Sequence, residues 1–258
     1  MSIVIAPDSP DGLSHSLKEL LGSRLPKHDS AASVFVLGVS GGSMVNMLSS
    51  IFAQLSSVDW SKVRIIFCDE RKVPLDNADS TAGAYRKKLQ ETGAKIPDAN
   101  IIEIDASLSV ADCAADYEKK LKAIPGLTLN EEGFPKFDIL LLGMGPDGHT
   151  CSLFPGHAVL KENQRWVAPV SGSPKPPPER VTLTLPVIAA ALDVAIVATG
   201  TEKAGVIQEI LEGEQPDKYP VGFIAFSRLP TFWFLDKAAT SKLECTPILT
   251  KFEELAAL

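Results

Sequence analysis

Residues 34–55 read VFVLGVSGGSMVNMLSSIFAQL, in which an apolar run, a turn of small residues and a second apolar pattern follow directly on one another. The run Val34–Val39 is apolar or glycine at every position, which is typical of a strand covered on both faces. From Met44 to Leu55 the apolar residues recur at helical spacing. This stretch therefore predicts a strand, a tight loop and a helix in succession.

The same alternation of strand-like and helix-like segments continues along the chain. It predicts an α/β fold with a mainly parallel sheet, helices on both faces and ligand-binding loops at the carboxyl ends of the strands. The proline-rich segment Ser171–Pro178, here called the proline loop, predicts a stiff, extended loop rather than a domain linker, because the segments on both sides are of one kind. We therefore expect a single domain over residues 1–258. The expected strands are Val34–Val39, Val63–Cys68, Phe137–Leu142, Val181–Leu185, Val194–Ala198 and Phe232–Leu235, and the expected helical stripes are Leu13–Leu21, Met44–Leu55, Val110–Leu121 and Ala204–Leu211.

The composition of the 258 residues limits the classes of partner. Hydrophobic residues make up 45% and charged residues 22%, so the chain has enough apolar material to fold, and disorder is excluded as its main state. With 25 Lys and Arg against 32 Asp and Glu, the formal net charge of −7 argues against a nucleic-acid or anionic-membrane partner. A small anionic substrate would need a locally positive site on this acidic protein.

Neither the N-terminus nor the cysteines indicate export. The run Ile3–Ala6 is far too short for the core of a signal peptide, and no stretch reaches the ~18 apolar residues of a membrane helix. The four cysteines form no C-x-x-C pair and have no ligand spacing with the histidines. This pattern predicts reduced thiols, a cytoplasmic protein and no metal site.

The glycine–serine loop, GVSGGS at residues 38–43, allows three interpretations. Small residues let a ligand approach the backbone, and free N–H groups at a helix start attract anions, so a phosphate cradle is favoured. The second interpretation is a plain turn with Ser43 as N-cap. The spacing Gly38-x-Ser40-x-Gly42 also fits the nucleophile elbow of serine hydrolases, although no HGGG-type oxyanion loop precedes it.

The histidine loop, GMGPDGHT at residues 143–150, follows the third expected strand. Its glycines match the dinucleotide-binding fingerprint literally, but Pro155 and Gly156 end any following helix too early for that fold. A carboxylate beside an imidazole fixes the tautomer of the ring and raises its basicity. Asp147 and His149 therefore predict a general base rather than a structural histidine.

Charged residues mark three other strand ends. Asp69, Glu70 and Arg71 end one strand, where a sheet presents catalytic groups, although such a triplet is also typical of a solvated turn. Arg180 begins a strand and Lys203 lies at a helix start, and either one alone would be an ordinary surface charge. Together with the glycine–serine loop, the two cations favour a phosphate site.

Five motifs are spread over nearly the whole chain: LGVSGGS (37–43), FCDERKVP (67–74), LLLGMGPDGHTCSLFPGH (140–157), SPKPPPERVTLTLP (173–186) and WFLDKAA (233–239). They resemble the motifs of the 6-phosphogluconolactonase family. The resemblance implies one Rossmann-like α/β domain, similar in fold to glucosamine-6-phosphate deaminase and, more distantly, to ribose-5-phosphate isomerase. It implies hydrolysis of 6-phospho-D-glucono-1,5-lactone to 6-phosphogluconate, the second step of the oxidative pentose phosphate pathway. It further implies no metal or organic cofactor and a monomer or weak homodimer.

With the reaction that the resemblance implies, we expect a role for each candidate residue. His149 would take the proton of the attacking water and return it to the ring oxygen, with Asp147 orienting the imidazole. Arg71 would stabilise the oxyanion or the sugar hydroxyls. Asp69 matches the position at which the deaminase keeps its proton-abstracting carboxylate, and here it would be structural or orienting. The implied phosphate ligands are Ser40, Gly41, Gly42, Ser43, Arg180 and Lys203.

Three alternative functions stay open. The deaminases carry a Glu five residues after the motif histidine, where this chain has Phe154, and this departure favours the lactonase. A serine esterase would use Ser40 as its nucleophile. A non-catalytic sugar-phosphate binding protein would have no need of the poised base that Asp147 and His149 predict.

Overall fold

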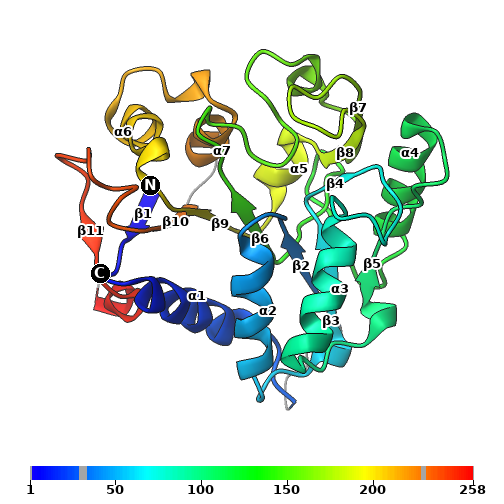
Figure 1. Cartoon of the computed structure of the whole chain (residues 1–258), viewed down its shortest axis with the longest axis horizontal. Coiled ribbons are helices and arrows are strands. Elements are labelled where there is room, and N and C mark those ends of the chain that lie inside the picture. The colour runs from blue at the N-terminus through cyan, green and yellow to red at the C-terminus, as the bar shows by residue number, and fades with distance from the viewer. Residues whose placement is uncertain (1, 29–33, 228–230, 258) are drawn as a thin grey trace.

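Strand β2 (Phe35–Val39) lies inside an eight-stranded sheet, and the loop after it leads into helix α2 (Met44–Gln54) (Figure 1). The computed structural model describes residues 2–28, 34–227 and 231–257. Neighbouring strands of this main sheet all run parallel. In spatial order they are β11 (Ile248–Leu249), β1 (Ser2–Ile5), β10 (Thr231–Leu235), β9 (Asp193–Ala198), β6 (Ile139–Gly143), β2, β3 (Val63–Phe67) and β5 (Ile101–Ile102).

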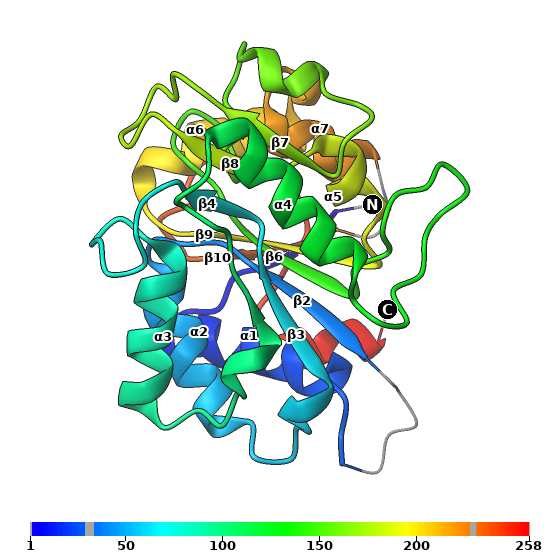
Figure 2. The same ribbon diagram turned by 90° about the vertical axis from the view of Figure 1, so that its right-hand side faces the viewer.

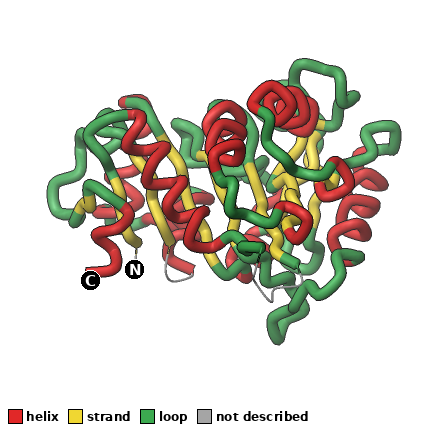
Figure 3. Tube along the Cα trace, turned by 90° about the horizontal axis from the view of Figure 1, so that it is seen from below, coloured by secondary structure: helices red, strands yellow, loops and turns green. Residues whose placement is uncertain are grey.

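Two groups of helices cover the two faces of the main sheet (Figure 2), and the view from below shows one group in front of the strands (Figure 3). The first group is α1 (Pro10–Arg24), α2 and α3 (Thr81–Thr92), and the second is α4 (Val110–Lys122), α5 (Leu185–Ala190), α6 (Ala204–Glu212) and α7 (Pro220–Ser227). Short 3₁₀ helices are η1 (Trp60–Lys62), η2 (Asp98–Asn100), η3 (Ala158–Lys161), η4 (Thr201–Lys203), η5 (Pro216–Lys218) and η6 (Phe252–Ala257). None of the described helices is long and apolar enough to cross a membrane.

The hydrophobic core consists of two clusters, one on each face of the main sheet. On β6, Leu140 and Leu142 belong to the cluster under α4–α7, whereas Ile139 and Leu141 belong to the cluster under α1–α3. All four side chains are fully buried. Side chains alternate along a strand, so a strand covered on both faces must be apolar at every position. This requirement explains the continuous apolar runs in the sequence.

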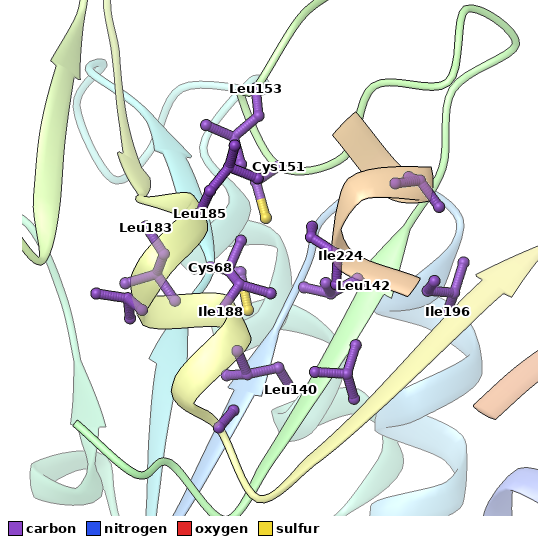
Figure 4. Close-up of a cluster of buried hydrophobic side chains, with 14 of the residues drawn as sticks. Cys68, Leu140, Leu142, Cys151, Leu153, Leu183, Leu185, Ile188, Ile196 and Ile224 are labelled. Atoms are coloured by element: carbon purple, nitrogen blue, oxygen red, sulfur yellow. The ribbon is translucent and has the colours of Figure 1, made fainter. Parts of the chain in front are cut away.

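A second, three-stranded antiparallel sheet packs beside the second group of helices. Its order is β4 (Asp69–Arg71), β8 (Arg180–Leu183) and β7 (Val167–Val170). Leu183 of β8 belongs to the same core cluster as Leu140 of the main sheet, and Figure 4 shows both in that cluster with Cys68 and Cys151. The small sheet therefore shares its core with the main one.

The α/β fold with a mainly parallel sheet is confirmed, and all six expected strands are present within two residues of their predicted bounds. The expectation that they form one sheet was wrong for Val181–Leu185, which pairs in the small sheet. The sequence pattern did not distinguish the two sheets, because this strand is also buried on both sides. Asp69–Arg71 form a strand rather than a turn. β1 was not predicted, because a four-residue run carries too little pattern.

The main sheet has a topological switch point between β2 and β6. From β2 the chain continues to β3 on one side, and from β6 it continues to β9 on the other, although β2 and β6 are hydrogen-bonded neighbours. Loops that leave two such strands in opposite directions open a crevice at the carboxyl ends. The glycine–serine loop follows β2 and the histidine loop follows β6, so both flank this crevice.

Candidate active site

A pocket of about 200 Å³ lies at the crevice. All the candidate residues from the sequence line it except Asp147, which is hydrogen-bonded to Nδ1 of His149. The carboxyl ends of β2, β6 and β9 with the loops that follow them, together with β4 and β8 of the small sheet, supply the walls, so residues far apart in the sequence meet at one edge. The pocket is lined by Ser40, Gly41, Gly42, Ser43, Met44, Asp69, Arg71, Gly143, Met144, Gly145, His149, Cys151, Arg180, Val197 and Lys203.

The glycine–serine loop forms a turn that leaves the start of α2 open to the pocket. Gly42 has φ +69°, a left-handed conformation that favours glycine. α1, α3 and α4 each begin with a serine whose hydroxyl accepts a first-turn N–H, whereas Ser43 makes no such bond at the start of α2. The Val45 N–H donates to the Gly42 carbonyl at 3.2 Å, and N–H groups at a helix start that lack an intrahelical acceptor are suited to binding an anion.

Ser40 differs from an activated nucleophile. Its backbone N–H donates to Leu141 at 3.1 Å and its carbonyl accepts from the hydroxyl of Tyr85 at 3.0 Å. Its Oγ is buried and has no hydrogen-bond partner within the described part of the chain. A serine nucleophile needs a base within hydrogen-bonding reach, and Ser40 lacks one. An unpaired buried hydroxyl at a pocket wall is instead suited to donating to a ligand.

The histidine loop holds Asp147 and His149 against each other. Nδ1 of His149 hydrogen-bonds to Oδ1 of Asp147, and the loop is closed by Gly145 N–H donating to the His149 carbonyl at 2.9 Å. A Cβ on Gly145 would lie 2.1 Å from Cε1 of His149, so this position requires glycine. The His149 ring also packs on Phe154, with 4.7 Å between centroids. With Nδ1 engaged, Nε2 is the nitrogen that can exchange a proton in the pocket.

The surroundings of His149 favour its neutral form. Burial lowers the pKa of His149, and the nearby Lys175 ammonium lowers it further, so that the opposing effect of Asp147 is outweighed. Burial would raise the pKa of Asp147, but the hydrogen bond from His149 and the charges around it bring that pKa below its usual value. A neutral imidazole beside an ionised carboxylate is the protonation state that a general base requires near pH 7.

Strand β4 places Arg71 in the pocket and Glu70 beneath it. Nη1 of Arg71 donates to the Asp79 carbonyl at 2.9 Å. The carboxylate of Glu70 is buried and accepts the N–H groups of Arg71, Thr81 and Ala82 at 2.7, 2.9 and 2.7 Å. Glu70 thereby ties β4 to the first turn of α3. Burial raises the pKa of Glu70, although these three hydrogen bonds oppose the shift.

Asp69 and Arg180 form a buried pair at the base of the pocket. Oδ2 of Asp69 accepts from Ser152 Oγ at 2.7 Å and lies 3.9 Å from Nη1 of Arg180. The other donors of Arg180 bond to the carbonyl oxygens of residues 175–177 at 3.0, 2.8 and 3.1 Å. The guanidinium thus fastens the proline loop through Nε and Nη2, whereas Nη1 donates to Ser152 Oγ at 3.4 Å and brings a buried positive charge to the pocket.

Lys203 lines the pocket together with the glycine–serine loop. It ends η4, directly before α6, and its side chain is mostly buried. Its Nζ is 3.9 Å from Oε1 of Glu202, which is too long for a hydrogen bond. The ammonium group is therefore placed to bind an anion held at the start of α2.

Two side chains that shape the site, Lys175 and Ser152, were not predicted from the sequence, and Phe154 was predicted only as a departure from the deaminase motif. Lys175 reaches His149 from the proline loop, Ser152 bridges Asp69 and Arg180, and Phe154 packs on the imidazole. Lys175 had a detectable signal, because it is the one cation in a stiff proline loop that precedes a buried Arg180. Ser152 had none, because its role depends on a contact between β4 and β8.

The histidine loop does not bind a dinucleotide in the usual way, since it leads into turns and an isolated bridge between Thr150 and Leu153 instead of a helix. Within residues 2–28, 34–227 and 231–257, no group of three or more His, Cys, Asp or Glu side chains is arranged to hold a metal ion.

By its sheet and its strand-end pocket, the molecule falls in the class of parallel α/β enzymes that keep their active site at a topological switch point. Residues 8–233 match the model of a family described as glucosamine-6-phosphate isomerases/6-phosphogluconolactonase. The chain belongs to this family.

Curated relatives and solved structures agree with the family. The chain is 45% identical over 241 residues to 6-phosphogluconolactonase of Rattus norvegicus, covering 91% of each chain. It is 45% identical over 217 residues to 6-phosphogluconolactonase of Homo sapiens, covering 83% of this chain and 82% of the human one. The structure of 6-phosphogluconolactonase from Trypanosoma cruzi superposes with a TM-score of 0.79 at 30% identity, over 95% of this chain and 98% of the other.

Proposed function

We propose that the protein hydrolyses 6-phospho-D-glucono-1,5-lactone to 6-phospho-D-gluconate. The observation that carries the proposal is the shared pocket, which is lined by His149, held by Asp147, and also by the loop at the start of α2 and by Lys203. A lactonase for a phosphorylated sugar needs a base for water at one end and an anion site at the other. The curated relatives that are named for this activity support the same substrate.

The reaction needs one group that both removes and returns a proton. Nε2 of His149 takes a proton from water as the water oxygen bonds to C1 of the lactone, which gives a tetrahedral oxyanion. When this intermediate collapses, the bond between C1 and the ring oxygen breaks, and His149 returns the proton to that oxygen. The products are a hydroxyl at C5 and a carboxyl at C1, so no other reactant is required. Asp147 keeps Nδ1 protonated throughout, so that Nε2 is the nitrogen that takes the proton and returns it.

The remaining pocket groups bind and polarise the substrate. The 6-phosphate is held by the N–H groups of residues 41–43, the Ser40 hydroxyl and the Lys203 ammonium, with the buried charge of Arg180 adding to the positive field. Arg71 stabilises the oxyanion at C1. Asp69 orients Arg180 and Ser152 rather than abstracting a proton from carbon. Fixing the phosphate positions C1 beside His149 and lowers the barrier through proximity.

Two other activities find less support in the pocket. A deaminase of the related type carries a carboxylate where this chain has Phe154, whose ring packs on His149 and under the Arg180 guanidinium. A serine esterase needs a base beside Ser40, and its Oγ has no such partner among the described residues. The cytoplasmic location, the single domain and the monomeric or weakly dimeric state stay predictions.

The proposal is tested by generating the lactone enzymatically at low temperature and mildly acidic pH, where it opens slowly, and following 6-phosphogluconate formation. The purified protein should accelerate this step over the uncatalysed rate, and the His149→Ala variant purified in the same way should not. Equal rates with and without protein would overturn the proposal. Ammonia release from glucosamine 6-phosphate, or labelling of Ser40 by a fluorophosphonate, would point to the alternatives.

A further inference from the structure

The proline loop brings the ammonium group of Lys175 to His149, the proposed general base. Lys175 Nζ lies 3.3 Å from Nδ1 of His149 and 3.6 Å from Oδ1 of Asp147. Lys175 is not among the residues that line the pocket, and it reaches the pair from the proline loop. Its ammonium is therefore badly placed to bind the phosphate or the oxyanion and well placed to act on Asp147 and His149.

The backbone at Lys175 is held in place by two sets of contacts. The Arg180 guanidinium donates to the carbonyls of residues 175–177. Ser173 Oγ donates to the Lys175 carbonyl at 2.8 Å, and Ser173 N–H donates to the Pro178 carbonyl at 3.0 Å. With the main chain fixed in this way, only the side chain of Lys175 has to be ordered to reach the carboxylate.

We propose that Lys175 is a positioning residue for the proposed lactonase reaction: it shares the Asp147 carboxylate with the imidazole and places a positive charge beside Nδ1 that keeps His149 unprotonated before water attacks. This inference rests on the proposed function. The same charge makes the imidazolium formed during attack a stronger acid, which favours return of the proton to the ring oxygen. Lys175 thus acts through His149 and touches no substrate atom.

Several charges act on the imidazole, and Lys175 is the nearest cation among them. Asp147 on the same loop and Asp69 on β4 favour the imidazolium, whereas Lys175 and burial disfavour it, with burial the largest effect on the pKa of His149. The other cations that face the ring share the pocket with it and will be screened by bound substrate. They are Arg71, Arg180 and Lys203.

The test compares Lys175→Met, Lys175→Arg and the wild type by the NMR titration of the His149 ring without substrate. Four histidines make the spectrum simple, and His149→Ala assigns the signal. In Lys175→Met the His149 pKa should rise by about one unit, as expected for loss of a unit charge in contact with the ring. Lys175→Arg should keep the wild-type value, as should Lys88→Met, which removes an exposed lysine paired with Glu91 on α3.

The same variants are then assayed for lactone hydrolysis over a range of pH. The acid limb of kcat/KM should move up with the NMR value in Lys175→Met, with KM at high pH unchanged. An unshifted His149 titration in a folded Lys175→Met protein would overturn the inference whether or not the protein is a lactonase. A shifted titration with no lactone turnover by the wild type would instead overturn the proposed function.

Discussion

On one side of the crevice, the start of α2 has no side-chain cap, the Ser40 hydroxyl has no partner among the described residues, and Lys203 makes only a long contact with Glu202. On the other side, Asp147, His149 and Arg180 are each held by protein groups. We call these the binding side and the catalytic side. Unsatisfied groups gain their partners when an anion arrives, whereas groups that move protons must be in place beforehand.

The largest expected effect comes from replacing His149, the central residue of the catalytic side. His149→Ala removes the acid–base group and should lower kcat by about 10²–10⁴-fold, the usual contribution of a positioned proton carrier. KM should change little, because the protein groups that are proposed to bind the 6-phosphate are unchanged in this variant. Steady-state kinetics with a coupled 6-phosphogluconate readout measure this change. The matched control is His15→Ala, which removes an exposed histidine paired with Glu253, and near wild-type turnover in His149→Ala would refute the assignment.

A substitution at Arg180 tests whether this residue belongs to the catalytic side or to the binding side. Although the sequence places it with the phosphate ligands, its donors hold the proline loop and it pairs with buried Asp69. Arg180→Met should therefore lower the free energy of unfolding by about 3 kcal/mol, because a buried carboxylate and several carbonyls lose their partner. Chemical denaturation measures the loss. Arg165→Met, at an exposed arginine, is the control, and a rise in KM without loss of stability would return Arg180 to the binding side.

Lys203 gives a smaller and purely kinetic effect. Its ammonium has no close partner among the described residues, so Lys203→Met should leave stability nearly unchanged and raise KM by about tenfold, the value of one charge-assisted hydrogen bond. kcat should stay within a small factor of the wild type. Inorganic phosphate should inhibit the variant less well than the wild type. An unchanged KM together with unchanged phosphate inhibition would remove Lys203 from the binding side, and Lys88→Met is the matched control.

The two sides also differ in how far the sequence predicts them. The binding side follows from local pattern, because a strand, small residues and a helix occur in order between Val34 and Leu55. The pairing of Asp147 with His149 was likewise visible within one loop. The rest of the catalytic side was not, because Ser152, Lys175 and Arg180 meet Asp69 or His149 only through the antiparallel sheet of β4, β8 and β7. Long-range register of this kind has no local signal.

The smallest expected effect is a shift in the pH profile of kcat/KM, and it separates the contributions that Asp147 and Lys175 make to the pKa of His149. Because the pKa of His149 lies below its ordinary 6.5, the neutral base persists as pH falls, and the acid limb of kcat/KM in the wild type should have its midpoint below that value. Asp147→Asn removes the neighbour that favours the imidazolium, so its midpoint should move lower still. Lys175→Met removes a neighbour that disfavours it, so its midpoint should move higher. Rates corrected for spontaneous lactone opening measure all three midpoints. Shifts of the same sign in the two variants would show that these neighbours act through the shape of the loop, whereas opposite shifts require that each acts through its charge on one imidazole.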